Sequence, residues 1–421
     1  MVRSTTPPGR LRRWLTVLTV VLAVLPLAAD ALNRVLPAEV ATPLEWVAYS
    51  WLGVALYLFL ALLALEPVRW VLRRVQRRRE AAPEPAKALS TAAAGEAHDA
   101  PLGDEDPAHH EEEAAPNRPV DTGAGSVQPH SRPADDRVID PSRRLFLARS
   151  LAATAGAVAL GTAGTGAYFA NSAPVVQRVP ITLQGLSPAL DGFRIVTFSD
   201  GHLSPTYGGR RFERLVEIVN AQRPDVVAIV GDLVDGEVDE LRSDVAPLAD
   251  LVSEQGVFFV TGNHEYYVDT RAWLRHLPTL GVEILRNERM PLRRGTATFD
   301  LAGIDDRTAA ASGVPGHGAN LDAALDGRDD ATPVVLLAHQ PVQVEQAAAA
   351  GVDLQLSGHT HGGQLWPFDY VMTLDQPIID GLTQFGDTQL YVTRGAGYWG
   401  PPMRIGARPE VTVVELRSPR S

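Results

Sequence analysis

The sequence predicts a mixed α/β domain preceded by membrane-spanning helices. Two patterns support this fold class. Long uncharged apolar runs flanked by arginines lie within residues 1–79. From about Gln177 onward, short runs rich in Val, Ile, Leu and Phe recur, and each stops at polar residues. Helix-like stretches at 211–220 and 239–254 separate some of these runs.

Residues 1–79 are predicted to form two transmembrane helices, at about 14–32 and 44–65. The run at 14–29 is uncharged but interrupted by Pro26, and the run at 46–65 is long enough to cross a hydrocarbon core of about 30 Å. Arginines precede the first run and follow the second, so both flanks are predicted to be cytoplasmic. The alternative for the first run is a cleaved signal peptide.

Residues 80–141 are predicted to be a disordered linker. They are rich in Ala, Pro, Glu, Asp and Gly and contain almost no large apolar residues, so they cannot bury enough surface to offset chain entropy. His109, His110 and the three glutamates after them lie in this linker. We interpret them as a solvated low-complexity run and not as a metal site.

Residues 142–173 contain a third apolar segment. Arg143 and Arg144 precede the uncharged run 151–170, which is weakly hydrophobic because it contains four glycines. Paired arginines before such a run resemble a twin-arginine export signal, here in an internal position, which makes the twin-arginine export machinery a possible partner. A buried helix or an ordinary third span are the alternatives. If the segment spans the membrane, the domain at 174–421 is predicted to be extracytoplasmic in a multi-pass protein of the cell membrane.

Five predicted strands of this domain deliver Asp, His or Asn to their carboxyl ends. In α/β sheets that edge is where ligands bind. The strands at 193–198, 226–230, 257–260, 334–338 and 352–356 are followed, in that order, by Asp200 and His202, by Asp232 and Asp235, by Asn263, His264 and Glu265, by His339, and by His359 and His361. Five of the seven histidines in the domain fall at these ends, which neither core nor surface histidines would do by preference.

The composition restricts the chemistry of such a site. The chain has no cysteine, so only oxygen and nitrogen ligands are available, and carboxylates with imidazoles suit Mn, Fe or Zn. The net charge of −12 argues against a nucleic-acid partner, which normally needs a basic patch.

The motifs resemble those of the calcineurin-like metallophosphoesterases. Asp200-x-His202, Gly231-Asp232-x-x-Asp235, Gly262-Asn263-His264-Glu265, His339 and Gly358-His359-x-His361 occur in the order and approximate spacing of that superfamily. The extended motifs Gly262 to Tyr267 and Gly358 to Gln364, with Arg394 to Gly397, are similar to those of its bacterial membrane-associated branch. That branch includes exported wall-associated phosphoesterases and UDP-2,3-diacylglucosamine pyrophosphohydrolases. The resemblance covers about residues 190–418.

The resemblance implies a fold and a site. The fold would be a four-layer α-β-β-α sandwich of two mixed sheets between helices. Asp200, His202 and His361 would hold one divalent ion, Asn263, His339 and His359 a second, and Asp232 would bridge them. A hydroxide between the ions would attack phosphorus, and His264 would donate a proton or hydrogen bond to the leaving oxygen. Glu265 could orient that ring, Asp235 could support the ligands, and Arg394 could bind phosphate.

The predicted function is hydrolysis of a phosphodiester or pyrophosphate bond in a membrane-, lipid- or wall-linked substrate. A phosphomonoesterase, or a catalytically weak membrane-tethered scaffold, are the alternatives. The intact set of ligands favours the enzyme. UDP-linked substrates are cytoplasmic and conflict with an extracytoplasmic site. Tyr266, Tyr267, Trp366, Tyr398 and Trp399 lie beside the motifs and could line an apolar groove or pack in the core.

Overall fold

The computed structural model describes residues 2–33, 35–36, 38–81, 141–204 and 207–419. The chain divides into two compact units, one of residues 1–65 with 147–421 and one of residues 66–146. The predicted linker falls mostly on residues 82–140, and it lies outside the described residues together with His109 and His110.

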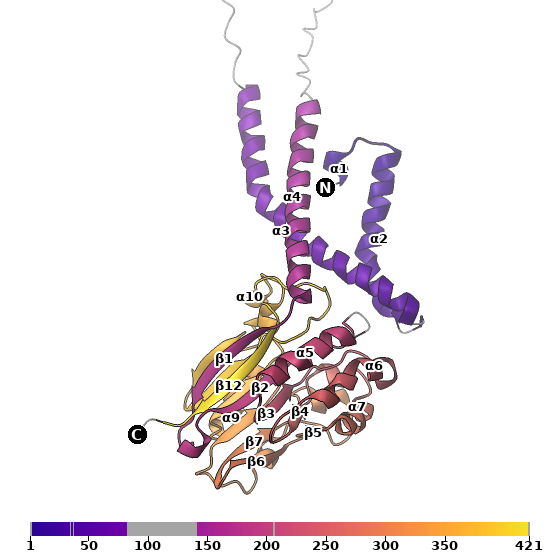
Figure 1. Ribbon diagram of the computed structural model, residues 1–421. Helices are drawn as coiled ribbons and strands as arrows, with labels where there is room; N and C mark the ends of the chain where they lie inside the picture. Colours follow the sequence, from indigo (N-terminus) through magenta and orange to yellow (C-terminus); the bar gives the residue numbers. More distant parts are fainter. Residues whose placement is uncertain (1, 34, 37, 82–140, 205–206, 420–421) are drawn as a thin grey trace, which may run out of the picture. The chain divides into compact units, whose positions relative to one another are not determined.

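The N-terminal part is helical (Figure 1). Its elements are α1 (Val2–Thr5), α2 (Arg10–Asn33), α3 (Ala38–Ala81) and α4 (Pro141–Asn171). Three segments of the described chain are long and apolar enough to cross a membrane, namely Arg10–Leu32, Val40–Val75 and Leu145–Asn171. α3 extends well beyond the predicted 44–65 because most of the residues that follow, arginines above all, are good helix formers.

The rest of the chain contains two six-stranded mixed sheets. The first has the order β1-β12-β2-β3-β4-β5, and all its neighbours are parallel except β12 and β2. Its strands are β1 (Val175–Thr182), β2 (Phe193–Phe198), β3 (Val226–Val230), β4 (Val257–Val260), β5 (Val282–Ile284) and β12 (Glu410–Arg417).

The second sheet has the order β10-β11-β9-β8-β7-β6. Its outer pairs, β10 with β11 and β6 with β7, are antiparallel, and the inner pairs are parallel. Its strands are β6 (Glu288–Arg294), β7 (Ala297–Gly303), β8 (Val334–Leu337), β9 (Leu354–Ser357), β10 (Gly381–Phe385) and β11 (Thr388–Val392).

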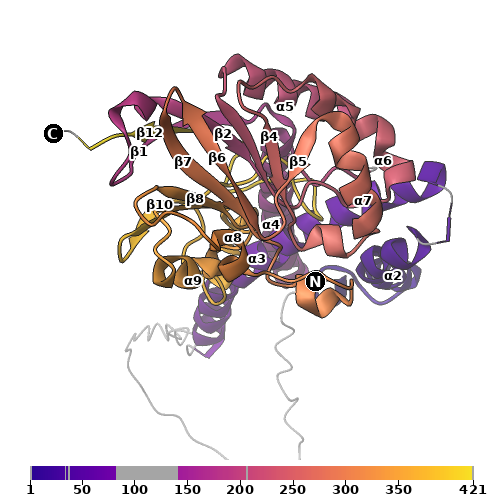
Figure 2. The same ribbon diagram turned by 90° about the horizontal axis from the view of Figure 1, so that it is seen from below.

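Helices cover the outer face of each sheet (Figures 1 and 2). The α-helices here are α5 (Gly209–Ala221), α6 (Val238–Val245), α7 (Thr270–His276), α8 (Leu321–Leu325), α9 (Val344–Ala349) and α10 (Asp369–Met372). The 3₁₀ turns are η1 (Pro188–Leu190), η2 (Ala246–Asp250), η3 (His264–Tyr266), η4 (Leu277–Leu280), η5 (Ala309–Ser312), η6 (Pro341–Gln343) and η7 (His361–Gly363). The helix expected at 239–254 stops at Val245, because Pro247 lacks the N–H that the next turn would need.

Three apolar clusters define the four layers. Strand residues alternate between faces, so that Val196 and Phe198 of β2 pack under α5, α6 and α7, whereas Ile195 faces the second sheet. The cluster between the sheets includes Phe258 of β4 and Leu301 of β7. A third cluster packs the far face of the second sheet, from β7 and β8, against α8 and α9. The predicted α-β-β-α sandwich is therefore confirmed.

Candidate metal centre

The five loops that follow β2, β3, β4, β8 and β9 meet at one edge of the two sheets. They bring the predicted acidic and histidine ligands into overlapping groups whose ligand atoms lie within 4.8 Å of one another. These groups are Asp200 with His202 and His361, Asp232 with His339 and His359, and His202 with Asp232 and His264. Side chains that are distant in the sequence thus share a single, largely buried cluster.

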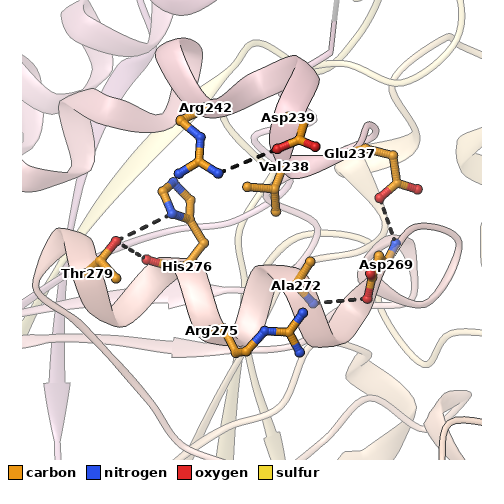
Figure 3. Close-up of a pocket in the computed structure, with 9 residues that line it drawn as sticks. All are labelled: Glu237, Val238, Asp239, Arg242, Asp269, Ala272, Arg275, His276 and Thr279. Carbon is orange, nitrogen blue, oxygen red and sulfur yellow. Dashed lines mark hydrogen bonds and ion pairs between the residues drawn. The ribbon is translucent and has the colours of Figure 1, made fainter.

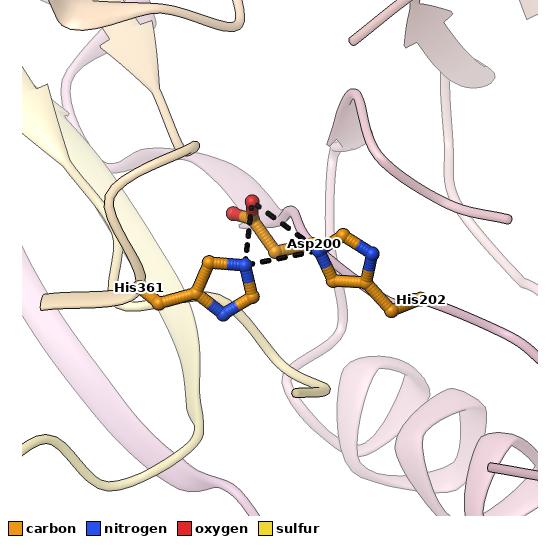
Figure 4. A group of neighbouring side chains, drawn as sticks. All are labelled: Asp200, His202 and His361. Carbon is orange, nitrogen blue, oxygen red and sulfur yellow. Dashed lines mark hydrogen bonds and ion pairs between the residues drawn. The ribbon is translucent and has the colours of Figure 1, made fainter. Parts of the chain in front are cut away.

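The first group is compact (Figure 4). Nε2 of His361 lies 3.4 Å from Oδ1 of Asp200 and 2.9 Å from Nε2 of His202. The two rings stack, with centroids 4.8 Å apart. Three ligand atoms that converge in this way from a carboxylate and two imidazoles suit a divalent cation such as Mn, Fe or Zn.

In the predicted second ligand set, Asn263, His339 and His359, two polar atoms lack a hydrogen-bond partner among the described residues. Oδ1 of Asn263 and Nε2 of His339 are buried and make no hydrogen bond, although His339 Nε2 lies 3.0 Å from Oδ2 of Asp232. The other ring nitrogen of His339 donates to the carbonyl of Val230 at 2.8 Å, which leaves the Nε2 lone pair directed at the cluster. Buried polar groups normally have partners, so this geometry fits a metal ligand set.

Asp232 lies between the two groups. Its Oδ2 is 3.0 Å from Nε2 of His339 on one side and 4.0 Å from Nε2 of His202 on the other. The side chain is buried. A carboxylate in this position can bridge two cations.

Asp235 connects two of the histidines. Its Oδ1 lies 2.9 Å from Nδ1 of His202 and 2.7 Å from Nδ1 of His264. When both Nδ1 atoms carry the proton, both Nε2 atoms are free to face the cluster. Asp235 therefore fixes the tautomer and the orientation of these two rings.

Glu265 anchors the backbone of the ligand loops, since the hydrogen bonds of its carboxylate go to backbone N–H groups. The role in orienting the His264 ring that we expected for it stays a prediction. The carboxylate of Glu265 accepts hydrogen bonds from the N–H groups of Asp232 (2.9 Å), Leu233 (2.8 Å), Val234 (3.3 Å) and Gly262 (2.7 Å). The side chain turns inward because these loop N–H groups have no strand partner. Burial and the neighbouring Asp232 raise the pKa of Glu265 to about 7.

Arg394 is held by acidic residues, whereas the sequence suggested that it binds phosphate. Its guanidinium forms an ion pair with Asp380 and lies 3.9 Å from Glu410. The structure places it beside Gly362, next to His361. Its predicted contact with substrate would therefore have to compete with two carboxylates.

Arg404 is a site residue that the sequence did not reveal. It is fully buried and donates to the carbonyls of His361, Arg394, Gly395 and Gly397. Its Nη2 also lies 3.0 Å from Nδ1 of His361. A guanidinium can only donate, so Nδ1 accepts and Nε2 of His361 carries the proton toward His202.

The ligand loops adopt an uncommon backbone conformation. Asp200, His202, Asp232, His359 and His361 all have positive φ, between 45° and 71°. Non-glycine residues rarely adopt this left-handed region, although Asp and His tolerate it better than most. Strain of this kind clusters at functional sites.

The residues of the cluster differ in the direction in which their surroundings shift their pKa. Burial opposes the ionised form of Asp232, yet His339 and His264 hold the pKa of Asp232 well below its usual range. Burial would lower the pKa of His264, but Asp232 and Asp235 raise it to about 9. Burial and His339 lower the pKa of His359 to about 4. His264 is thus set to carry a proton at neutral pH, and His359 to be the neutral ring that binds a cation.

A separate pocket of about 440 Å³ lies between α6 and α7 (Figure 3). Its polar lining includes Glu237, Arg242, Asp269, Arg275 and His276. Arg242 pairs with Asp239, and Asp269 caps α7 by accepting from the N–H of Ala272. None of the clustered ligands lines this pocket.

The fold and the cluster define a two-sheet α/β domain with a candidate centre for divalent metal ions. Residues 193–363 match the family model of the calcineurin-like phosphoesterases. The chain is 40% identical over 301 residues to "Transmembrane protein with metallophosphoesterase domain" of Danio rerio, an alignment that covers 70% of this chain and 67% of the relative. The protein belongs to the calcineurin-like metallophosphoesterase family.

Relatives occur in bacteria and in animals. An uncharacterized metallophosphoesterase of Helicobacter pylori strain J99 is 37% identical over 66% of this chain and 73% of its own length. The uncharacterized metallophosphoesterase YkuE of Bacillus subtilis is 31% identical over 66% of this chain and 98% of its own length. The chain covers about two thirds of the vertebrate relatives from Danio rerio and Bos taurus, at 67% and 65%.

Among solved structures, a dimetal phosphatase from Danio rerio is similar at 15% identity, with 49% of this chain and 88% of that chain covered and a TM-score of 0.33. Because the identity and the TM-score are this low, the assignment to the family rests on the sequence relatives and not on this structure.

Proposed function

We propose that this protein is a binuclear metal-dependent phosphoric ester hydrolase. Asp200, His202 and His361 would hold one divalent ion, and Asn263, His339 and His359 a second. The observation that carries the proposal is the position of Asp232, whose Oδ2 lies 3.0 Å from His339 Nε2 and 4.0 Å from His202 Nε2. A carboxylate between two ligand groups can offer oxygen ligands to both cations and so bridge them.

The chain's own residues would bind and orient the phosphoester and move one proton. When bound, a pair of divalent ions draws charge from phosphate oxygens and makes water a stronger nucleophile near neutral pH. His264 lies at the margin of the cluster, with Nδ1 on Asp235 and Nε2 4.0 Å from Asp232 Oδ2. With its pKa raised to about 9, His264 can donate a proton or hydrogen bond to the oxygen that leaves phosphorus.

The proposed substrate is a phosphodiester or pyrophosphate that is linked to the membrane, to lipid or to the wall. Three segments long and apolar enough to span a bilayer support membrane attachment. The arginines before the first segment and after the second support a multi-pass topology with the metal-bearing domain outside the cytoplasm. The proposal of export through the twin-arginine machinery rests on the sequence alone, namely on Arg143 and Arg144. The structure does not describe the side chains of these two residues.

Hydrolysis by the purified full-length chain in detergent would test the proposal. A chromogenic phosphodiester and its monoester would each be supplied with added Mn, with Zn, or with a chelator. Asp232→Asn would remove the shared carboxylate charge, and Asp322→Asn, at an exposed position in α8, would be the matched control.

We expect metal-dependent cleavage that Asp232→Asn abolishes and Asp322→Asn leaves unchanged. A preference for the diester would agree with the proposed substrate class, and a preference for the monoester would replace it. Cleavage that persists in chelator or in Asp232→Asn would reject the binuclear site.

A further inference from the structure

An exposed apolar segment, residues 366–374, lies beside the candidate metal centre. Its large side chains point outward, with exposed fractions of 51% for Trp366, 68% for Tyr370 and 85% for Leu374. Phe368 and Val371 are also exposed, and Asp369 is the one charged residue in the segment. Contiguous exposed apolar surface of this kind usually marks a place of interaction.

The sheet topology places the metal-bearing edge next to the third membrane segment. β1 starts with Val175 opposite Glu410, the first residue of β12. β12 runs antiparallel to β2, and β3 and β4 run parallel to β2. The end of β2, which leads to Asp200, therefore lies at the same edge as the start of β1. α4 ends at Asn171 and β1 starts at Val175, and the four steps between these two residues can span at most ~14 Å.

The residue before the apolar segment and the loop around Met403 contact α3 and α4. Leu365, which precedes the segment, is buried in one apolar cluster with Met403 and with Tyr57, Ala159 and Ala163 of α3 and α4. The N–H of Arg404 donates to the carbonyl of Gly166 in α4 at 2.9 Å. The segment therefore begins where two helices that are long and apolar enough to span a membrane contact the domain.

The segment is also connected to the metal centre. The side-chain amide of Gln364 donates to the carbonyl of Trp399 at 2.8 Å and accepts from its N–H at 3.0 Å. The Trp399 ring, itself exposed, lies 5.7 Å from the ring of His264. Trp399, which is held by Gln364 just before the apolar segment, thus lies at the margin of the site.

We propose that the apolar segment inserts into the bilayer interface and holds the metal-bearing edge against the membrane. Trp and Tyr favour the headgroup level, where one end of the ring is apolar and the other is hydrated, and Leu374 and Val371 would enter the acyl boundary. The site then meets its substrate at the level of lipid phosphates. This last step rests on the proposed phosphoesterase function, whereas the membrane contact does not.

The absence of cysteine makes the contact directly testable. Leu374→Cys and Tyr370→Cys, each labelled with an environment-sensitive nitrobenzoxadiazole probe, would be reconstituted as full-length chains in phosphatidylcholine–phosphatidylglycerol vesicles. Val252→Cys is the matched control, because Val252 is an exposed apolar residue just before β4, at the opposite edge of the sheet.

We expect the probe at positions 370 and 374 to emit at shorter wavelength than the probe at 252. Lipids that carry a nitroxide near the headgroup should quench most of the emission at 370 and 374 but not the emission at 252. Emission at 370 and 374 that equals the emission at 252 would overturn the proposal. The exposed apolar segment would then be a candidate surface for a protein partner. Thermal melts of the three labelled variants would verify that each is folded.

A second measurement separates the membrane contact from the activity. Leu374→Asp should lower hydrolysis of a phosphoester embedded in vesicles while leaving hydrolysis of the soluble chromogenic diester unchanged, and Val252→Asp should change neither. Equal loss on both substrates would contradict a role in reaching the membrane. If the unaltered protein cleaves neither substrate, the phosphoesterase proposal fails, and the quenching result still decides the membrane contact.

Discussion

Nδ1 of His264 lies 2.7 Å from Oδ1 of Asp235, and the same carboxylate oxygen lies 2.9 Å from Nδ1 of His202. One acid thus sets the orientation of a proposed metal ligand and of the proposed proton donor. Burial would raise the pKa of Asp235, but its contacts with His202 and His264 lower this pKa to about 2. Asp235 is therefore ionised throughout the physiological range.

Replacing Asp235 tests this relationship. Asp235→Asn keeps the shape but removes the negative charge and can offer an N–H where both rings need an acceptor. We expect kcat for phosphoester cleavage to fall by about 10–100-fold, the usual effect of losing a residue that orients metal ligands. Asp239→Asn, at an exposed position in α6, should leave kcat unchanged. Unaltered activity in Asp235→Asn would exclude an orienting role.

Glu265 is expected to be a stability residue. Each of its carboxylate oxygens faces two backbone N–H donors, so either orientation of the amide in Glu265→Gln directs an NH₂ group at donors. Leaving such buried groups unsatisfied costs about 1–3 kcal/mol. The melting temperature should drop by several degrees, whereas Glu254→Gln, on an exposed loop, should not change it. A wild-type melting temperature in Glu265→Gln would contradict this assignment.

Metal removal should destabilise the domain. Ligands that bind only the folded state stabilise it, by about 2.7 kcal/mol at a concentration 100 times Kd. For a domain of this size that corresponds to roughly 5–10 °C in melting temperature. We expect a chelator to lower the melting temperature, added Mn or Zn to restore it, and Asp232→Asn to show a much smaller difference. A melting temperature that changes neither with chelator nor with added metal would contradict a metal centre.

The strands that carry the candidate ligands could be predicted from local sequence, whereas the pairing of distant strands could not. The strands β2, β3 and β4 are short β-branched runs that stop at Asp or Asn, and this pattern needs only local information. Parallel strands bring their carboxyl ends to one edge, so the meeting of Asp200, Asp232 and Asn263 followed from the pattern. The pairing of β1 with β12, from opposite ends of the domain, has no local signal.

Arg404 and Glu265 show what the sequence could not reveal. Arg404 stands alone between Met403 and Ile405 without any motif, and its role arises because the fold places four backbone carbonyls around its guanidinium. Glu265 follows His264 directly, which suggested contact with that ring. Its side chain turns instead to the N–H groups after β3, which no spacing rule predicts.

Gly358 illustrates how tightly the ligand loops approach one another. A Cβ at this position would overlap the hydroxyl of Ser199 and Oδ2 of Asp200. Gly358→Ala should therefore displace Asp200 and weaken binding at the first metal group, with loss of most activity. At Gly208 the nearest atom to a Cβ would be Oδ1 of Asp244 at 3.4 Å, so Gly208→Ala is the matched control. Metal content by mass spectrometry would check both, and full metal occupancy in Gly358→Ala would refute the argument.

The proposed topology can be tested with the same cysteine-free background. Arginines before the first apolar segment and after the second favour a cytoplasmic location for both flanks, and a third span then carries the metal-bearing domain to the other side. Val252→Cys should react in intact cells with a maleimide that cannot cross the membrane. Ala93→Cys, between the second and third segments, should react only after lysis. The reverse pattern would place the domain in the cytoplasm, where nucleotide-linked phosphoesters would again be eligible substrates.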